Sequence, residues 1–93
     1  MIRSFRDKHT EQLFNRNKPG KYPPEILRRS KIKLNLIDAA ETIDDLNVPP
    51  GNRLEQLSGD RSEQWSIRIN QQWRICFEWQ NGDAYNVEIV DYH

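Results

Sequence analysis

Residues 65–90 read WSIRINQQWRICFEWQNGDAYNVEIV, and this stretch decides the fold. Large apolar side chains alternate with polar ones in three segments, Trp65–Ile69, Trp73–Trp79 and Tyr85–Ile89. Such alternation is typical of antiparallel strands that have one buried face. Polar turn residues separate the segments, so the sequence predicts a three-stranded meander. A shorter strand near residues 53–57 is expected to join it.

The pairing of these strands follows from the buried face, because a slip of one residue moves every side chain to the other face. A two-residue turn at Asn81-Gly82 would set apolar residues opposite polar ones. We therefore expect a three-residue loop, which pairs Trp79 with Tyr85, Phe77 with Val87 and Ile75 with Ile89. The same rule brings Arg68 directly opposite Arg74 in the first hairpin.

Two arginines that face each other across a strand pair repel. A bound anion would offset the repulsion, because the guanidinium fork matches the geometry of a phosphate. Alternatively, each arginine pairs with a nearby carboxylate, such as that of Glu55, Glu78 or Glu88. We favour the anion, since Tyr92 is expected on the same uncovered side of the sheet, diagonal to Arg74.

A helical repeat precedes the strands, from about residue 24 to residue 40. Its apolar stripe predicts a buried face made of Ile26, Leu27, Ser30, Ile32, Leu34, Ile37 and Ala40. The other directions of the helix carry Arg28, Arg29, Lys31 and Lys33, which form a cationic face. A shorter helix through residues 13–14, capped by Asp7 or Ser4, is expected before it, after a short strand at residues 2–5.

Helices followed by strands are typical of the α+β class. We expect one domain, residues 1–93, in which two N-terminal helices pack on one face of a small antiparallel sheet. The chain has 93 residues, of which 35% are hydrophobic, and its longest apolar run is residues 75–77. That run is too short for a transmembrane helix or a signal peptide. With Cys76 as the single cysteine, neither a disulfide nor a cysteine-built zinc site is expected, and we expect a cytoplasmic protein.

Charge is divided unevenly along the chain. Residues 1–34 hold ten basic and three acidic side chains, a net charge of +7, whereas residues 35–93 have a net charge of −7. Such a split suggests that one half faces a polyanion such as nucleic acid. A solvated outer helix face explains the split equally well, and charge alone favours neither interpretation.

The sequence ends Asp91-Tyr92-His93, directly after the last predicted strand. The strand would hold these three side chains beside Arg68 and Arg74. Their carboxylate, phenol and imidazole groups can accept, donate or transfer protons. No histidines, cysteines or carboxylates have the spacing of a metal site, so we expect neither a metal nor a cofactor.

Four segments resemble the HigB branch of the RelE/ParE toxin superfamily: Leu54–Arg61, Trp65–Asn70, Gln72–Phe77 and Asp91–His93. The beginning of the chain and its length also fit, so the resemblance covers the whole chain. It implies a RelE-like α+β toxin of a type II toxin–antitoxin pair. Such a toxin is an endoribonuclease that cuts mRNA in the ribosomal A site. A HigA-type antitoxin with a helix-turn-helix is the implied inhibitory partner.

The resemblance also implies functional positions. These are Arg74 of the Trp-Arg motif and the terminal Asp91, Tyr92 and His93. The chain departs from the pattern at Glu55 and Ser58, where a relative has histidine and lysine.

Cleavage of RNA without a metal needs a base for the 2′-hydroxyl, a cation beside the phosphorane and an acid for the departing 5′-oxygen. Our hypothesis gives the cationic role to Arg74, with help from Arg68, and proton transfer to His93. Asp91 would orient or act as a partner base, and Tyr92 would donate a hydroxyl and stack on a base. Glu55 is a further candidate base.

The cationic helix face, Arg28, Arg29, Lys31 and Lys33, would then bind ribosomal RNA. The alternative function is a binding module that does not cut RNA. Such a protein would resemble the gyrase poisons of the same superfamily, or would be a weak toxin that acts mainly in its antitoxin complex and in transcriptional autoregulation.

Overall fold

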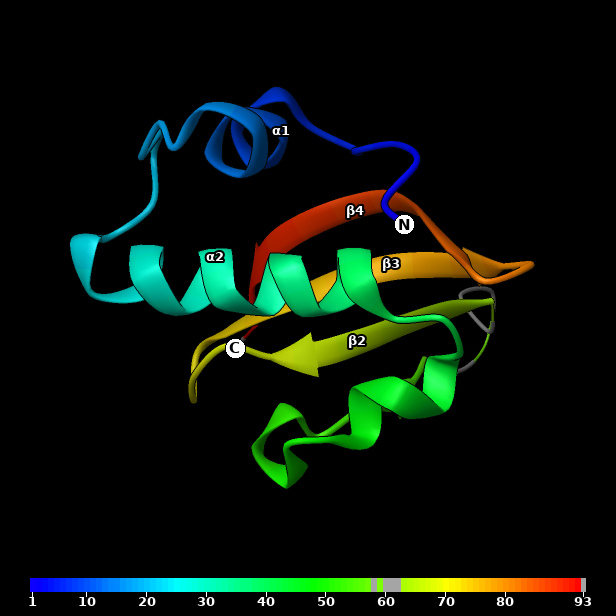
Figure 1. Cartoon of the computed structure of the whole chain (residues 1–93). Helices are drawn as coiled ribbons and strands as arrows, with labels where there is room; N and C mark the ends of the chain where they lie inside the picture. The colour runs from blue at the N-terminus through cyan, green and yellow to red at the C-terminus, as the bar shows by residue number, and fades with distance from the viewer. Residues whose placement is uncertain (58, 60–62, 93) are drawn as a thin grey trace.

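In the computed structural model, which describes residues 1–57, 59 and 63–92, helices come first and strands follow (Figure 1). The helical elements are α1 (Lys8–Arg16), α2 (Pro24–Ala39) and two short 3₁₀ helices, η1 (Ile43–Asn47) and η2 (Pro50–Asn52). The strands are β1 (Glu55–Gln56), β2 (Gln64–Arg68), β3 (Trp73–Gln80) and β4 (Asp83–Asp91). They form one antiparallel sheet in the order β1-β2-β3-β4. The predicted α+β arrangement is confirmed, but the pattern of the sequence did not predict η1 and η2.

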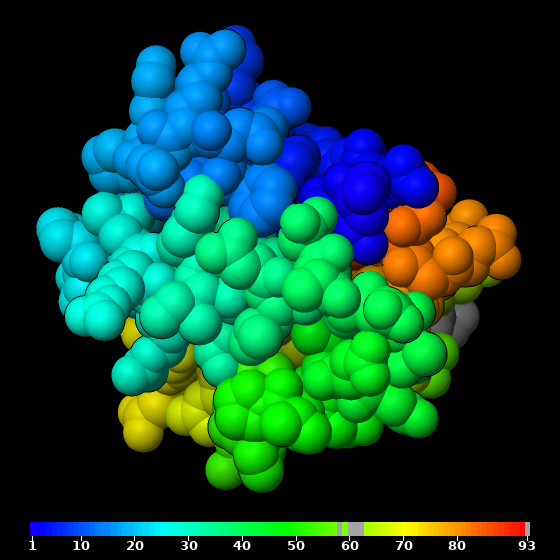
Figure 2. Space-filling model, in the orientation of Figure 1, coloured from blue at the N-terminus to red at the C-terminus, as the bar shows by residue number. Residues whose placement is uncertain are grey.

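The helices lie on one side of the sheet, with α2 crossing in front of β3 (Figure 1). Figure 2 shows that α1, α2 and the segment with η1 and η2 hide most of the sheet from this side. The core between these layers includes Phe77, Ile67, Ile75 and Val87, each at most 1% exposed. Among the described residues, no helix is long and apolar enough to cross a membrane.

The caps of the helices follow from the flanking residues. Asp7 accepts a hydrogen bond from the amide of Thr10 at 2.7 Å and begins α1 as predicted. Ser4 has another role, because its hydroxyl accepts from the amide of Asn86. Pro24 occupies the first turn of α2, where a missing N–H costs nothing.

The apolar stripe of α2 is narrower than predicted. Ile26, Ser30, Leu34 and Ile37 are buried, and Leu27 is half-buried against the core. Ile32, expected in the buried face, is 49% exposed. A single sheet face covers only one side of the helix, so a side chain at the margin of the stripe stays in water.

The first hairpin has the predicted register. Trp65 pairs with Phe77, Ile67 with Ile75, and Arg68 with Arg74. The two arginines therefore lie directly opposite each other on neighbouring strands.

The second hairpin has a shorter loop than predicted. Gln80 pairs with Asp83, so the turn has two residues, Asn81 (φ 53°) and Gly82 (φ 83°). Positive φ at both central residues is what a type I′ turn requires. Phe77 is not directly paired with Val87, and Trp79 lies opposite Ala84 rather than Tyr85.

An extra residue in β4 reconciles this turn with a continuous buried face. The register shifts between Cys76 and Glu78, and Asn86 in the opposite strand has a left-handed backbone with φ 53°. Such a bulge moves the strand by one residue. Beyond it, Ile75 pairs with Ile89 as predicted.

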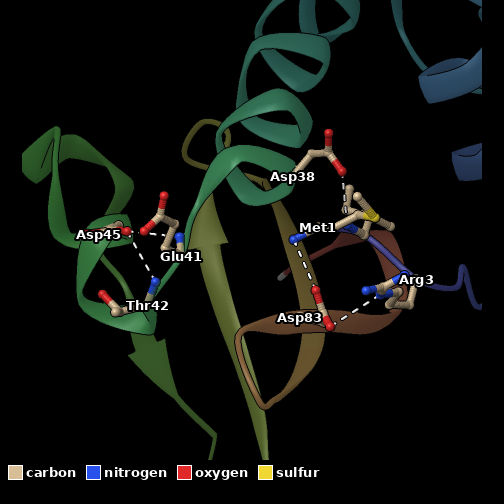
Figure 3. Close-up of polar contacts among 8 residues, drawn as sticks. Met1, Arg3, Asp38, Glu41, Thr42, Asp45 and Asp83 are labelled. Atoms are coloured by element: carbon tan, nitrogen blue, oxygen red, sulfur yellow. Dashed lines mark hydrogen bonds and ion pairs between the residues drawn. The ribbon is translucent and has the colours of Figure 1, made fainter.

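The first residues run beside β4 as a short parallel segment, through isolated bridges of Ile2 with Ala84 and Phe5 with Val87. Polar contacts fix its beginning (Figure 3). The carboxylate of Asp83 lies 3.3 Å from the amino group of Met1 and 3.2 Å from Arg3 Nε. Asp38 of α2 accepts from the amide of Ile2 at 2.9 Å. The strand predicted at residues 2–5 is thus reduced to two bridges.

Candidate active site

Arg74 lies near the beginning of β3, on the other face of the strand from the core residues Ile75 and Phe77, and it is only 8% exposed. Its Nε donates to the hydroxyl of Ser66 at 3.0 Å, and its Nη2 donates to the carbonyl of Arg53 at 2.7 Å. Among the described residues, Nη1 has no hydrogen-bond partner. This corrects the expectation of an exposed arginine on an uncovered face. Ser66 and Cys76 on the same face are also buried.

Two predicted site residues lie beside this guanidinium. The Arg74 Cζ atom is 5.8 Å from the centre of the Tyr92 ring, and Tyr92 is 42% exposed. The Glu55 carboxylate is 3.9 Å from Arg74 Nη2. Its side chain is 59% exposed, so solvent screens the attraction and the ion pair is weak. The structure thus brings Arg74, Tyr92 and Glu55 together.

Arg68 faces Arg74 in the strand pairing, but the two guanidinium groups bind different partners. Arg68 Nε donates to the carbonyl of Asn70 at 3.0 Å, towards the β2–β3 turn. The other carboxylates considered as partners are also engaged elsewhere, since Arg6 contacts Glu88 at 2.6 Å and Glu78 at 3.8 Å. Of the predicted carboxylate pairings, the structure therefore contains the contact of Arg74 with Glu55.

Asp91 is placed differently from Tyr92. It pairs with Trp73, whose ring packs on Tyr22 on the helix side of the sheet. Since directly paired residues share a face, Asp91 lies at the edge of that side. Its carboxylate accepts a hydrogen bond from the side-chain Nε2 of Gln72 at 3.1 Å. His93, like Ser58, lies outside the described residues.

The β2–β3 turn forms a depression beside Tyr92. It has a volume of about 680 Å³ and is lined by Asn70, Gln71, Gln72 and Tyr92. The Tyr92 amide donates to the carbonyl of Gln72 at 2.6 Å, which fixes the end of β4 to this turn. A base could stack on the exposed ring at this place.

The four cations of α2 have different surroundings. Lys31 donates to the carbonyls of Leu13 and Phe14, so it caps the end of α1. Lys33 donates to the side chain of Asn52. Burial lowers the pKa of Lys33, and the charge of Arg29 lowers it further. Arg28 and Arg29 are exposed. The helix therefore does not present four equivalent cations to solvent.

Sequence reasoning missed two residues that hold Arg74. Ser66 could have been found, because a small polar residue between large ones falls on the same strand face as Arg68. Arg53 could not, because it contributes a backbone carbonyl, which the turn after η2 orients with a left-handed φ of 45°. Within residues 1–57, 59 and 63–92, no three His, Cys, Asp or Glu side chains come close enough together to hold a metal ion.

Residues 3–93 match the model of a family described as RelE-like toxin of type II toxin-antitoxin system HigB. The chain is 39% identical over 87 residues to the Vibrio cholerae protein named Toxin HigB-1, with 92% of each chain covered. It is also 39% identical over 93 residues to Endoribonuclease HigB of Proteus vulgaris, with both chains covered completely. An uncharacterized protein of Haemophilus influenzae is 32% identical over 84 residues, which is 89% of this chain and 83% of that one.

Proposed function

The chain belongs to the HigB-like family of RelE-type toxins of type II toxin–antitoxin systems and is an endoribonuclease, and we propose that it cuts mRNA in the ribosomal A site without a metal ion. The observation that supports this most is the placement of Arg74. Its guanidinium is fixed by Ser66 and Arg53, with the Tyr92 ring on one side and the Glu55 carboxylate nearby. Such a fixed cation suits a phosphate that gains charge during reaction.

The proposed reaction is transfer within the RNA strand. A base removes the proton of a 2′-hydroxyl, and the oxygen attacks the adjacent phosphorus. The phosphorane then collapses to a 2′,3′-cyclic phosphate as the bond to the 5′-oxygen breaks, and an acid protonates that oxygen. Arg74 stabilises the additional negative charge of the phosphorane, with help from Arg68.

Proton transfer in this proposal comes from groups around Arg74. Glu55 is exposed and close to the guanidinium, which supports a role as the base. His93 is the proposed proton donor, because the ordinary pKa of histidine is near neutral pH. Tyr92 stacks on a base of the substrate, and Asp91 orients the end of β4 through Gln72.

The ribosome supplies the positioning that so small a site lacks, because an aligned substrate alone accounts for a large rate factor. The exposed Arg28 and Arg29 of α2 support a contact with ribosomal RNA, with Lys31 and Lys33 contributing charge. The family implies an antitoxin as partner, and we propose one of the HigA type with a helix-turn-helix. A protein that acts on ribosomes would work in the cytoplasm.

Primer extension on transcripts after brief induction tests the proposal. We expect cuts within a translated reporter mRNA and none when its start codon is destroyed. Cuts in both reporters would contradict ribosome dependence. Growth arrest without any cut would favour the non-nucleolytic, gyrase-poison-like alternative.

Replacement of His93 tests the proton donor. His93→Gln should lower cleavage by a factor on the order of 10²–10⁴, the usual contribution of a positioned acid or base. Glu55→Gln, measured in the same assay, tests the base. If His93→Gln cuts at the wild-type rate and Glu55→Gln does not, the proton-transfer role of His93 is wrong.

A further inference from the structure

A second cavity adjoins the Tyr92 depression, and of its lining residues the proposed chemistry uses only Arg68. It has a volume of about 430 Å³ and is lined by Arg29, Gly51, Arg53, Arg68, Ile69, Asn70 and Gln71. We call it the arginine groove. Asn70 and Gln71 line both cavities, so the arginine groove continues from the depression beside Tyr92. Its volume lies within the usual range for small-ligand sites.

Three elements bring the arginines of the groove together. Arg29 comes from α2, Arg53 follows η2, and Arg68 ends β2. Arg29 Nη1 donates to the carbonyl of Ile69 at 3.3 Å, and Arg68 Nε donates to that of Asn70 at 3.0 Å. One nitrogen of the Arg29 guanidinium and one of the Arg68 guanidinium are thus anchored on the β2–β3 turn. A guanidinium has five N–H donors, so each retains donors for a ligand.

The positive charge of the groove is not neutralised within the described part of the chain. The ion pairs found there involve Arg3, Arg6, Arg74 and the amino terminus of Met1, and none involves an arginine of the groove. The charge of Arg29 also lowers the pKa of Lys33, after the larger effect of burial. Like charges gathered without carboxylates destabilise a protein unless an anion offsets them.

The groove is also joined to the proposed catalytic residue. Arg53 lines the groove, and its carbonyl accepts a hydrogen bond from Arg74 at 2.7 Å. An anion held in the groove would therefore lie next to the reacting phosphate, as the next phosphate of one RNA strand does.

We propose that the arginine groove, formed by Arg29, Arg53 and Arg68, binds RNA phosphates that flank the cleaved bond. This inference rests on the proposed function, because an RNA substrate makes phosphate the expected anion. The phosphates belong either to the mRNA strand or to ribosomal RNA. Arginine contacts with phosphate strengthen binding to all sequences and make it depend on salt.

Gly51 offers a test that leaves every arginine in place. A Cβ atom built at Gly51 meets nothing within 4 Å, so side chains fit there. Binding to a fluorescent single-stranded oligoribonucleotide should be tightest for Gly51→Arg, weaker for Gly51→Gln and weakest for Gly51→Glu. Gln and Glu have nearly the same size, so their difference isolates charge. Equal affinities for the Gln and Glu variants would overturn the proposal.

Neutralising arginines gives a second test. Arg53→Gln and Arg29→Gln should each weaken oligoribonucleotide or ribosome binding several-fold and reduce the salt slope by about 0.7, the value for one single-strand phosphate. Arg16→Gln, on the exposed end of α1, is the matched control and should change neither. A loss seen with the oligoribonucleotide identifies the mRNA strand, and a loss seen only with mRNA-free ribosomes identifies ribosomal RNA. Unchanged binding in both assays would overturn the proposal.

These measurements separate the groove from the proposed function, because binding is read without cleavage. If the wild-type chain cuts no RNA but its binding responds to Gly51→Glu, the proposed function fails and the groove remains. If the wild type cuts mRNA and the groove variants bind and cut equally well, only the groove fails. Circular dichroism melting of each variant confirms that the full chain is folded.

Discussion

The guanidinium of Arg74 has its orientation fixed before any substrate arrives. Bonds to the hydroxyl of Ser66 and the carbonyl of Arg53 hold its plane, and the Tyr92 ring restrains it from another side. A side chain fixed in this way loses little conformational freedom when an anion binds. The same bonds mean that Arg74 contributes to folding as well as to the proposed chemistry.

We expect Arg74→Ala to lower the free energy of unfolding by about 1–3 kcal/mol, because it leaves the Arg53 carbonyl without its donor. It should also lower mRNA cleavage by a factor on the order of 10²–10³. Chemical denaturation and primer extension measure the two effects. Arg74→Lys is the companion, since it keeps the charge but not the fork. If Arg74→Ala is as stable as wild type, the described hydrogen bonds carry no net energy.

Part of this arrangement was predictable from the residues themselves. Alternation in residues 65–79 fixed the pairing of Arg68 with Arg74, which the structure confirms. The burial of Arg74 was not predictable, because it depends on a carbonyl that reaches the sheet from the turn after η2. Nor could charge counting show that Arg6 pairs with Glu88, since that contact joins distant parts of the chain.

At the scale of elements, the β3–β4 hairpin combines a turn and a strand register that do not fit each other in a regular hairpin. The Asn81-Gly82 pair favours a two-residue turn, and the apolar alternation demands the register of a longer loop. The bulge at Asn86 allows both. The alternation was therefore a correct guide to the pairing of Ile75 with Ile89, but not to the loop. The bulge shifts the buried position before Val87 from Tyr85 to the small Ala84, and the large Tyr85 hides this shift in the sequence.

Gly82→Ala should lower the free energy of unfolding by about 1–2 kcal/mol, because its φ of +83° is a left-handed conformation. A Cβ there would also lie 3.2 Å from the carbonyl oxygen of Glu41. Thermal or urea denaturation measures the change. Gly51→Ala is the control, since its Cβ meets nothing within 4 Å, and it should change stability by only about 0.5 kcal/mol or less. Equal stability of the two variants would contradict the turn.

At the scale of the whole molecule, the charge split between the two halves of the chain is partly neutralised by folding. Arg3 and Arg6 of the basic half pair with Asp83 and Glu88 of the acidic half. Asp45, an acidic residue of η1, accepts hydrogen bonds from the backbone amides of Glu41 and Thr42 just before that helix (Figure 3). The net positive charge available to a partner is therefore concentrated at fewer residues than the sequence suggests, among them those of the arginine groove.

The free energy of unfolding should fall in acid because the carboxylate of Asp83 becomes protonated. Burial raises its pKa, but the hydrogen bonds and charges of Arg3 and the amino terminus outweigh burial and hold the pKa below its ordinary value of 3.8. A carboxyl with a lowered pKa stabilises the fold above the ordinary value, and this contribution is lost as pH falls through the lowered pKa. The difference in stability between wild type and Asp83→Asn should be largest near neutral pH and should shrink as pH falls below 3.8 and through the lowered pKa. Urea denaturation across pH measures it, and a difference independent of pH would contradict this assignment.

The segment at residues 2–5 has one more consequence, for behaviour at high concentration. Its bridges to Ala84 and Val87 cover the first half of the edge strand β4. The opposite edge strand, β1, is only two residues long and includes the charged Glu55. Long uncharged edges are where sheets of separate molecules join and aggregate. We therefore expect free copies of this chain to resist edge-to-edge pairing of their sheets at high concentration.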